Sequence, residues 1–459
     1  MGPQPEGIGG AESADAGYSE PTPTPSLSEP PAPSVPLPVG LDAMFPLPGA
    51  TDLCPDPALH LQFPETPTLG SSGKVSIFDA DDPSSPVVTI DLSQSVLSDT
   101  IGGATFKLSR VAYVDGKEVI FTLPSRGLGY GKTFYVTIAQ GVIKQAGGQD
   151  FVIDDSDTWR FSTASGAPAD TGELRVALDG TGQFCGVQSA IDAAQDDTTI
   201  SIGAGNYYGI IYFKGKRGLT LSGDDRDTTA LKGINNDKLN SGTRARALIG
   251  SENVSNLVVE NLTIENLTPQ DGSQAEALAL LSCDQCIVKN SNILSLQDTL
   301  LWQGRIYADN CYIAGNVDYI WGTGSVYFNA CEIHTLGRKG YNVQARNAAG
   351  KHGYVFVDSK LTSDPGITGD ILARIDVSQY PASEVAYIDC EIGPHISSAG
   401  WVVTGGSAGG SLRFVEYGSH DPSGNAIDTS QRLSGSRQLS SDEADAYRDP
   451  AQFFDGWSP

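Results

Sequence analysis

The stretch Lys289-Asn-Ser-Asn-Ile293 recurs in altered form as Asp309-Asn-Cys-Tyr-Ile313 and again as Asn329-Ala-Cys-Glu-Ile333, so that twenty residues separate each closing isoleucine from the next. Looser copies close on the aliphatic residues Ile264, Leu361 and Ile392. A period of twenty or more residues, with insertions of variable length, is typical of a parallel β-helix in which each repeat is one coil. The sequence therefore predicts a β-solenoid.

Two acidic residues share this register. Asp298 lies in Gln297-Asp-Thr-Leu300, and Asp318 follows twenty residues later in Val317-Asp-Tyr-Ile-Trp-Gly322. Adjacent strands lie about 4.8 Å apart, so we expect the two side chains to stack on one face. Two carboxylates that close cannot both ionise readily, and one is driven towards its acid form. The pair predicts a nucleophile beside a general acid.

Composition narrows the range of partners. The chain has 459 residues, of which 18% are charged, and its formal net charge is −26. This length suggests two or three domains. The negative charge argues against nucleic acids and anionic membrane surfaces as partners. No apolar run is long enough to span a bilayer.

Residues 1–41 are rich in proline, which supplies ten of the first forty residues. Such a composition cannot bury a core, and it predicts a disordered tether. No signal peptide begins at Met1, since the first basic residue is Lys74. We expect a secreted or cell-surface-anchored bacterial protein whose signal has been removed.

Residues 42–166 show short strand patterns separated by turn signals. The expected strands are Ala58–Phe63, Lys74–Phe78, Val87–Ile90, Ala112–Val114, Glu118–Thr122, Thr133–Ile138 and Trp159–Ser162. Their spacing predicts an antiparallel β-sandwich. The segment resembles the bacterial Ig-like domains of secreted and cell-surface enzymes, which implies a spacer or an attachment module.

Residues 170–459 form the predicted β-helix domain. Val187–Gln195 has apolar residues at helical spacing, which predicts an amphipathic helix that covers the open end of the solenoid. The expected strands after it are Leu219–Ser222, Leu257–Ile264, Ile287–Ile293, Ile306–Ile313, Val326–Ile333, Tyr354–Leu361 and Val385–Ile392. We expect the recurring Asn, Ser and Cys residues to form inward ladders at the turns.

The chain has seven cysteines, an odd number. Cys311 and Cys331 are twenty residues apart and should lie on adjacent coils, either as a disulfide or as two small buried hydrophobic side chains. Cys283 and Cys286 lack a second pair at metal-ligand spacing, so a zinc site is not expected.

Five polar residues fall on successive coils: Gln274, Gln297, Asp298, Asp318 and Arg374. An arginine facing one carboxylate would keep it ionised and oriented. The second carboxylate would hold a proton and act as acid and then base. Two glutamine amides aimed between them would stabilise an oxyanion, so the set suits acyl transfer from an ester.

The sequence at this point resembles the pectin methylesterases over about residues 182–457. The matching segments are Gly205-Asn-Tyr207, Gln274-Ala-Glu-Ala-Leu278, Gln297-Asp-Thr-Leu300, Gly315-Asn-Val-Asp-Tyr-Ile-Trp-Gly322, Tyr341-Asn-Val-Gln-Ala-Arg346, Arg374, His395-Ile-Ser-Ser-Ala-Gly-Trp401 and Phe414-Val-Glu-Tyr417. The resemblance implies a right-handed parallel β-helix, most simply a monomer, that needs no metal or cofactor. It also implies hydrolysis of the C6 methyl esters of homogalacturonan, the polymer of pectin, to pectate and methanol.

The resemblance assigns a role to each polar residue. It makes Asp318 the nucleophile and Asp298 the general acid/base. Gln274 and Gln297 become the anion hole, and Arg374 positions Asp318.

The chain departs from the family pattern near Arg374. Asp376 stands where the family has a tryptophan that stacks on the sugar, and Gly209 stands where a glutamate is expected. Four aromatic residues are candidates for the missing stacking surface: Tyr319, Trp321, Trp302 and Tyr380. For Trp302 and Tyr380 the alternative is packing in the core or at the rim.

Two other functions remain open from the sequence. Paired aspartates also cleave glycosidic bonds, so a glycoside hydrolase or lyase on the same scaffold is one alternative. The glutamines argue against it, because an oxocarbenium ion needs no anion hole. The loss of the family tryptophan makes the other alternative plausible, a polysaccharide-binding protein without activity, but the five retained polar residues argue against it.

Overall fold

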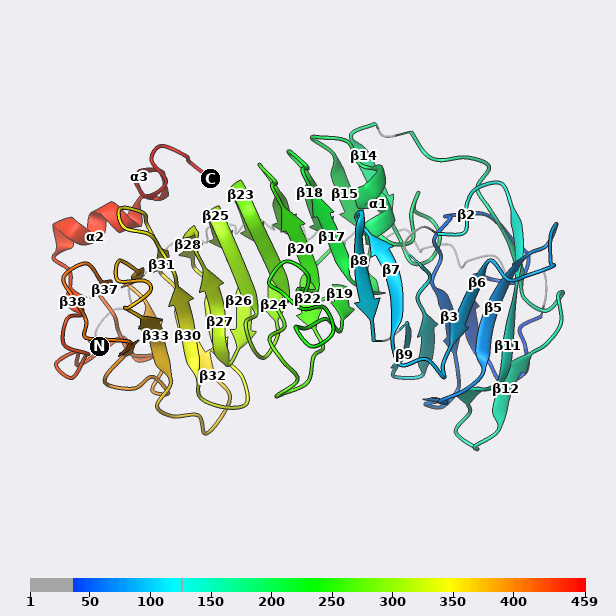
Figure 1. Cartoon of the computed structure of the whole chain (residues 1–459), viewed down its shortest axis with the longest axis horizontal. Coiled ribbons are helices and arrows are strands. Elements are labelled where there is room, and N and C mark those ends of the chain that lie inside the picture. The colour runs from blue at the N-terminus through cyan, green and yellow to red at the C-terminus, as the bar shows by residue number, and fades with distance from the viewer. Residues whose placement is uncertain (1–35, 110, 125–126, 170) are drawn as a thin grey trace, which may run out of the picture.

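The computed structural model describes residues 36–109, 111–124, 127–169 and 171–459, and most of the expected tether lies outside them. Two parts built from strands lie end to end along the long axis of the molecule (Figure 1). Among the described residues, no helix is both long and apolar enough to cross a membrane.

The N-terminal part consists of two sheets around a shared apolar core, with an additional hairpin. The first sheet, in the order β1-β3-β10-β9, contains β1 (Ala43–Phe45), β3 (Leu59–Gln62), β9 (Ala112–Asp115) and β10 (Glu118–Phe121). The second contains β2 (Ala50–Leu53), β4 (Thr68–Leu69), β5 (Lys74–Asp79), β6 (Val88–Asp91), β11 (Thr133–Lys144), β12 (Asp150–Ile153) and β13 (Arg160–Thr163). The hairpin is β7 (Leu97–Ile101) with β8 (Ala104–Leu108). Every expected strand of this part has an observed counterpart.

The C-terminal part is a parallel β-helix whose strands pair from coil to coil (Figure 1). One ladder contains β14 (Glu173–Val176), β15 (Thr199–Ile202), β17 (Ile211–Lys214), β18 (Thr220–Gly223), β20 (Ile249–Glu252), β21 (Val258–Glu260), β23 (Leu278–Lys289), β25 (Leu300–Asp309), β27 (Val317–Gly322), β28 (Ser325–Asn329), β30 (Tyr341–Ala345), β31 (Tyr354–Val357), β33 (Ile371–Asp376), β34 (Glu384–Ile388), β36 (Trp401–Thr404), β37 (Arg413–Tyr417) and β38 (Arg437–Gln438). The other contains β16 (Gly205–Tyr208), β19 (Thr229–Gly233), β22 (Thr263–Asn266), β24 (Asn292–Leu294), β26 (Tyr312–Gly315), β29 (Glu332–Thr335), β32 (Lys360–Ser363) and β35 (Glu391–Ile392).

The predicted register of the coils is confirmed. Ile293 pairs with Ile313, and Ile313 pairs with Ile333, so residues twenty apart stack directly in the second ladder. All three are fully buried, as a continuous aliphatic column inside the solenoid requires. Ile264, Leu361 and Ile392 extend the same column.

Each expected strand of the repeat is split in two at a corner. The corner residue has a left-handed backbone at Asn261 (φ 57°), Asn290 (φ 50°) and Asn310 (φ 50°), a conformation that asparagine tolerates better than most residues. Asn310 donates a hydrogen bond of 2.9 Å to the side chain of Asn290 on the exposed side of this corner. The expectation of inward asparagine ladders is therefore wrong, because the corner turns these side chains outward.

The inward positions after the corners hold small side chains instead. Cys311, Cys331 and Cys390 are buried there as free thiols, and Ser291 and Ser359 are buried at the same point of their coils. Of the two readings for Cys311 and Cys331, the structure supports the pair of small buried side chains.

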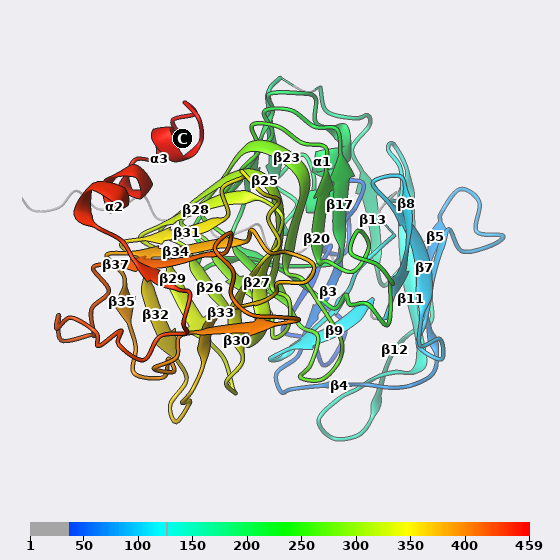
Figure 2. The ribbon, with the colours of Figure 1, turned by 60° about the vertical axis from the view of Figure 1, so that its left-hand side comes forward.

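Helices close the β-helix at one end and cover one outer face. The predicted amphipathic helix is α1 (Val187–Ala193), whose buried residues pack on the first coils. Near the C-terminus, α2 (Ser441–Arg448) and α3 (Pro450–Phe453) lie along the outer face of the solenoid (Figure 2). Phe453 and Phe454 pack there against Tyr327 of β28.

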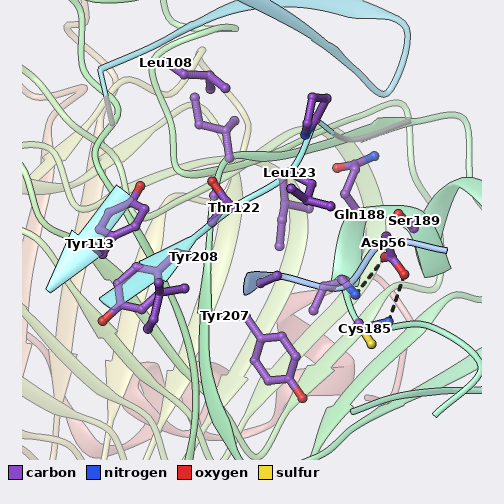
Figure 3. Close-up of a pocket in the computed structure, with 18 of the residues that line it drawn as sticks. Asp56, Leu108, Tyr113, Thr122, Leu123, Cys185, Gln188, Ser189, Tyr207 and Tyr208 are labelled. Carbon is purple, nitrogen blue, oxygen red and sulfur yellow. Dashed lines mark hydrogen bonds between the residues drawn. The ribbon is translucent and has the colours of Figure 1, made fainter. Parts of the chain in front are cut away.

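A disulfide joins the two parts of the molecule. Cys54 of the N-terminal part is bonded to Cys185, directly before α1, across 131 residues of chain. Beside it, the carboxylate of Asp56 accepts hydrogen bonds from the backbone N–H groups of Cys185 (3.0 Å) and Gly186 (2.8 Å) (Figure 3). The sequence analysis did not find this pair, because nothing in the sequence relates the two cysteines.

Further contacts fix the same junction. Asn240 of the β-helix exchanges two hydrogen bonds of 2.8 Å with the backbone of Lys107, and the rings of Tyr113 and Tyr208 stack 4.2 Å apart. A pocket at this junction is lined by both parts and contains none of the predicted site residues (Figure 3). The N-terminal part is thus docked on the end of the solenoid by a disulfide, hydrogen bonds and ring stacking.

Replacement of both Cys54 and Cys185 by serine is expected to lower the free energy of unfolding by about 2–4 kcal/mol, because the disulfide restricts the unfolded chain. Thermal unfolding without reductant measures the effect. Dithiothreitol should lower the melting temperature of the wild type towards that of the variant, and it should leave the melting temperature of the variant unchanged. Equal melting temperatures of variant and untreated wild type would contradict a stabilising role.

Candidate active site

A column of acidic residues crosses three successive coils on the face formed by β23, β25 and β27. Leu278 pairs with Leu300, and Leu300 pairs with Ile320, so these coils are in register. Two residues before each of these three positions stands a carboxylate, namely Glu276, Asp298 and Asp318. The predicted stacking of Asp298 on Asp318 is therefore present, and the column has a third member that the sequence analysis missed.

Asp298 and Asp318 have unusual backbone conformations. Their φ angles are 64° and 48°, in the left-handed region that few residues other than glycine adopt. Each is followed by buried residues that point into the solenoid, and each side chain is 11% exposed. Residues held in such conformations cluster at functional sites, because the surrounding fold must offset their cost.

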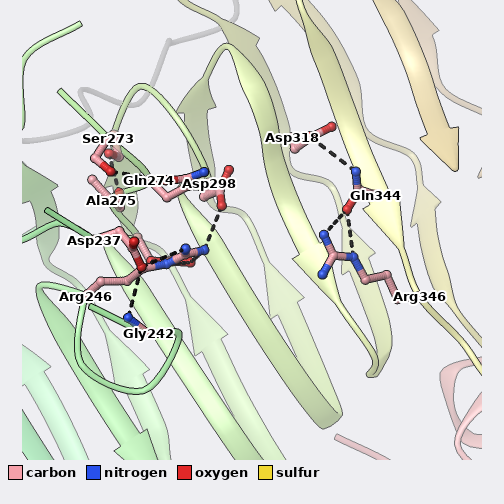
Figure 4. Close-up of polar contacts among 12 residues, drawn as sticks. Asp237, Gly242, Arg246, Ser273, Gln274, Ala275, Asp298, Asp318, Gln344 and Arg346 are labelled. Atoms are coloured by element: carbon pink, nitrogen blue, oxygen red, sulfur yellow. Dashed lines mark hydrogen bonds and ion pairs between the residues drawn. The ribbon is translucent and has the colours of Figure 1, made fainter. Parts of the chain in front are cut away.

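Arg374 and Gln344 hold the carboxylate of Asp318. The Nε atom of Arg374 donates to Oδ1 at 2.8 Å, and its Nη2 atom donates to Oδ2. Gln344 donates from Nε2 to the same Oδ2 at 3.3 Å (Figure 4). The two-pronged arginine contact that the sequence analysis expected for Asp318 is present, and it fixes the plane of the carboxylate.

Asp298 lies between charges of both signs. Arg246 donates from Nη2 to Oδ2 of Asp298 at 2.8 Å (Figure 4). Burial, with the negative charge of Glu276 as the next cause, raises the pKa of Asp298 to about 8; Asp318 also raises it, and Arg246 opposes the shift. A pKa of about 8 favours the protonated form of Asp298 at neutral pH.

The two glutamines lie on the coils that carry the carboxylates. Gln274 precedes β23, and its Oε1 accepts a hydrogen bond of 3.1 Å from Ser273, which turns the amide N–H₂ group away from Ser273 (Figure 4). Gln297 bridges to Val317 through the backbone, directly beside Asp298. Both side chains are partly exposed and can donate to a bound ligand.

Two of the four aromatic candidates are wrong as substrate contacts. Trp302 is fully buried inside the solenoid, where it stacks on Phe328 at 5.5 Å. Tyr319 is also fully buried, and its hydroxyl lies 3.5 Å from that of Thr335. For Tyr319 the reason is the left-handed backbone of Asp318, which interrupts the alternation of the strand and turns the side chain of Tyr319 inward.

Trp321 and Tyr380 instead lie against a cation at the outer face. The guanidinium of Arg346 is 4.4 Å from the ring centre of Trp321 and 5.8 Å from that of Tyr380. Arg346 also donates from Nε to Gln344 at 2.7 Å (Figure 4). This chain of contacts ends at Asp318, so both aromatic residues border the carboxylate column.

Asp376 does not compete for Arg374 in this arrangement. Its Oδ1 accepts hydrogen bonds from the backbone and hydroxyl of Ser378, at 3.0 and 2.6 Å, and its Oδ2 accepts one from Gln379 at 2.7 Å. These contacts leave Arg374 to Asp318. Asp376 caps the turn at the end of β33, and the hydroxyl of Ser378 holds it there.

Four residues around the carboxylates were given no role by the sequence analysis: Arg246, Glu276, Gln344 and Arg346. Glu276 could have been found, because it stands in the same register as the two aspartates. Arg246 comes from a loop of irregular length before β20, where no repeat relates it to the column.

The fold and this site define an ester hydrolase built on a parallel β-helix. The sequence model of the pectinesterase family matches residues 173–456, which include every polar residue of the site. The chain therefore belongs to the pectinesterase family, the carboxylic ester hydrolases that demethylate pectin.

Named relatives and solved structures agree with this assignment. Pectinesterase 31 of Arabidopsis thaliana is 29% identical over 293 residues, which cover 60% of this chain and 90% of the relative. Pectinesterase 2 of Olea europaea is 30% identical over 266 residues, or 55% and 71% of the two chains. The structure of the pectin methylesterase from carrot superposes with a TM-score of 0.57 at 28% identity, over 62% of this chain and 93% of that one. The β-helix is accordingly right-handed, as expected.

Proposed function

We propose that Asp318 is the nucleophile and Asp298 the general acid/base in hydrolysis of the C6 methyl esters of homogalacturonan. An oxygen of Asp318 attacks the ester carbonyl, and the amides of Gln274 and Gln297 donate to the oxyanion that forms. Asp298 gives its proton to the methoxy oxygen, the C–O bond breaks, and methanol leaves an acyl-enzyme anhydride.

The second half of the reaction restores the enzyme. Asp298, now ionised, takes a proton from water, and the hydroxide attacks the acyl carbon. The bond to Asp318 breaks, which frees the Asp318 carboxylate and a carboxylic acid on the polymer, and the acid gives its proton to the solvent and leaves as a carboxylate. No metal or cofactor enters either step.

The observation that supports this proposal most strongly is the asymmetry of the two stacked carboxylates. Asp318 is held by Arg374 with two hydrogen bonds, whereas Asp298 has a pKa of about 8. One carboxylate is thus oriented by a cation, as a nucleophile requires, and its neighbour is a proton donor at neutral pH.

Methanol release from highly methylated pectin, measured beside the appearance of reducing ends, tests this function. We expect methanol without new reducing ends. Reducing ends without methanol would favour the glycoside hydrolase, and neither product would favour a binding protein.

We further propose that Trp321 and Tyr380, with Arg346 between them, border the groove that holds the polymer. An aromatic face packs well on a sugar ring, and Arg346 suits the carboxylates of demethylated units. Asp376 lies two residues after Arg374 and belongs to the same rim.

For the chain as a whole, we propose a secreted or surface-anchored bacterial monomer in three parts: a tether over 1–41, an Ig-like sandwich over 42–166 and the catalytic β-helix over 170–459. Action on an extracellular polymer supports secretion. The two-sheet architecture of residues 42–166 supports the Ig-like assignment.

A further inference from the structure

We propose that Arg246 and Glu276 form a buried positioning pair for Asp298, in which Glu276 neutralises Arg246 so that Arg246 orients Asp298 without ionising it. This inference rests on the proposed role of Asp298 as proton donor and adds two residues to the machinery that serves it.

The hydrogen bonds of Arg246 are divided unequally. Glu276, which is fully buried, receives three of them: from Nε to Oε1 and to Oε2, both at 3.0 Å, and from Nη2 to Oε1 at 2.7 Å. Asp298 receives one, from Nη2 at 2.8 Å, and Asp237 lies 3.4 Å from Nη1. The positive charge of Arg246 is thus neutralised mainly by Glu276.

This division decides which carboxyl group holds the proton. A lone arginine in contact with Asp298 would favour its ionised form and so disable it as an acid. Burial raises the pKa of Glu276 too, but the hydrogen bonds from Arg246 act against that shift. When two carboxyl groups compete for one cation, the group with more hydrogen bonds keeps the charge and the other takes the proton.

The contact also selects the oxygen that carries the proton. Arginine can only donate hydrogen bonds, so the Oδ2 atom that Arg246 contacts must accept. Because the carbonyl oxygen of a carboxyl group is the stronger acceptor, this contact favours the proton of Asp298 on Oδ1. Arg246 thereby orients the acid, with its proton on the oxygen that Arg246 does not contact.

Other charges face Asp298 from neighbouring coils. Asp318, from β27, raises its pKa, and Arg346, after β30, lowers it. Arg374 of β33 also interacts with Asp298, although its hydrogen bonds go to Asp318. These groups serve the nucleophile, which leaves the Arg246–Glu276 pair as the unit dedicated to the acid.

The substitution Glu276→Gln tests the pair, because glutamine keeps the shape and removes the charge. The charge of Arg246 would then no longer be neutralised and would favour the ionised form of Asp298. The fall of kcat/KM for methanol release at alkaline pH (the alkaline limb), which follows loss of the Asp298 proton, should therefore begin at a pH lower by about one unit or more. The matched control is Glu416→Gln. Glu416 is also buried and is held by Arg432 at 2.8 and 3.0 Å, away from the carboxylate column, so its variant should keep the wild-type limb. An unmoved limb in Glu276→Gln would overturn the proposal.

The double variant Arg246→Gln/Glu276→Gln provides a second test that does not depend on a single buried charge. It removes both charges, so the pH at which kcat/KM declines should return to within about half a unit of the wild-type value. Loss of orientation should lower kcat about tenfold with little change in KM. If Glu276→Gln does not fold, the double variant is a sufficient test. A shift of a full pH unit in the alkaline decline of kcat/KM, or an unchanged kcat, would then overturn the proposal.

The Asp298→Asn variant separates this inference from the function on which it rests. Full activity in Asp298→Asn would refute the proposed mechanism itself. An inactive Asp298→Asn together with an unmoved limb in Glu276→Gln would refute only the role of the pair.

Discussion

Asp318→Asn is expected to reduce methanol release from methylated pectin by about 10⁴-fold or more, because the amide cannot attack the ester. The fold should survive the change, since Arg374, which loses its counter-ion, retains 34% of its side-chain exposure and can be solvated. Steady-state kinetics with circular dichroism at matched concentration measure both effects.

The matched control for this prediction is Asp284→Asn. Asp284 also receives two hydrogen bonds from an arginine of the same solenoid, Arg305, at 2.6 and 2.9 Å, but it lies outside the carboxylate column. Its variant should keep wild-type activity. An Asp318→Asn enzyme within tenfold of the wild type would remove Asp318 from the role of nucleophile.

Asp298→Asn is expected to lose the acid/base step, with a fall in kcat of about 10²- to 10⁴-fold. The pH dependence gives a sharper result. The pKa of Asp298 is raised to about 8, so the wild-type group is protonated below this pH and loses its proton above it. Because acylation needs the protonated form, kcat/KM of the wild type should decline as the pH rises through about 8.

In Asp298→Asn no proton can be lost at this position, so the residual activity should lack that decline. Profiles of kcat/KM between pH 5 and pH 10, from about three units below the midpoint to about two units above it, are sufficient to compare the two enzymes. A variant that retains the wild-type alkaline limb would show that another group supplies the proton.

The sequence predicted the solenoid because its period is visible in single residues. Ile293, Ile313 and Ile333 stack as expected, and the same spacing brings Asp298 above Asp318. A ladder of parallel strands repeats every contact at a fixed offset in the chain, so a register found once holds for the coils around it.

The errors came from places where local backbone breaks that regularity. The left-handed turn at Asp318 sends Tyr319 into the core, where simple alternation would have placed it outside. The corner residues turn outward for the same reason. A period in the sequence contains no signal for such turns except the presence of Asn or Asp, which also occupy ordinary positions.

Long-range contacts outside the repeat were equally hidden. Cys54 and Cys185 meet because the sandwich docks on the end of the solenoid, and Arg246 reaches Asp298 from an irregular loop. Glu276 is different, since the register that aligned the aspartates includes it. A column of three carboxylates with two arginines, rather than a pair with one, is therefore the site that this fold builds.

The covalent acyl intermediate on Asp318 can be trapped with hydroxylamine during turnover. We expect hydroxamate on the polymer or on Asp318, identified by mass spectrometry of the product and of the peptide that contains residues 317–322. Neither should form with Asp318→Asn. Sustained methanol release by the wild type with no hydroxamate on either partner, at hydroxylamine concentrations that compete with water, would rule out the acyl intermediate and indicate direct attack by water.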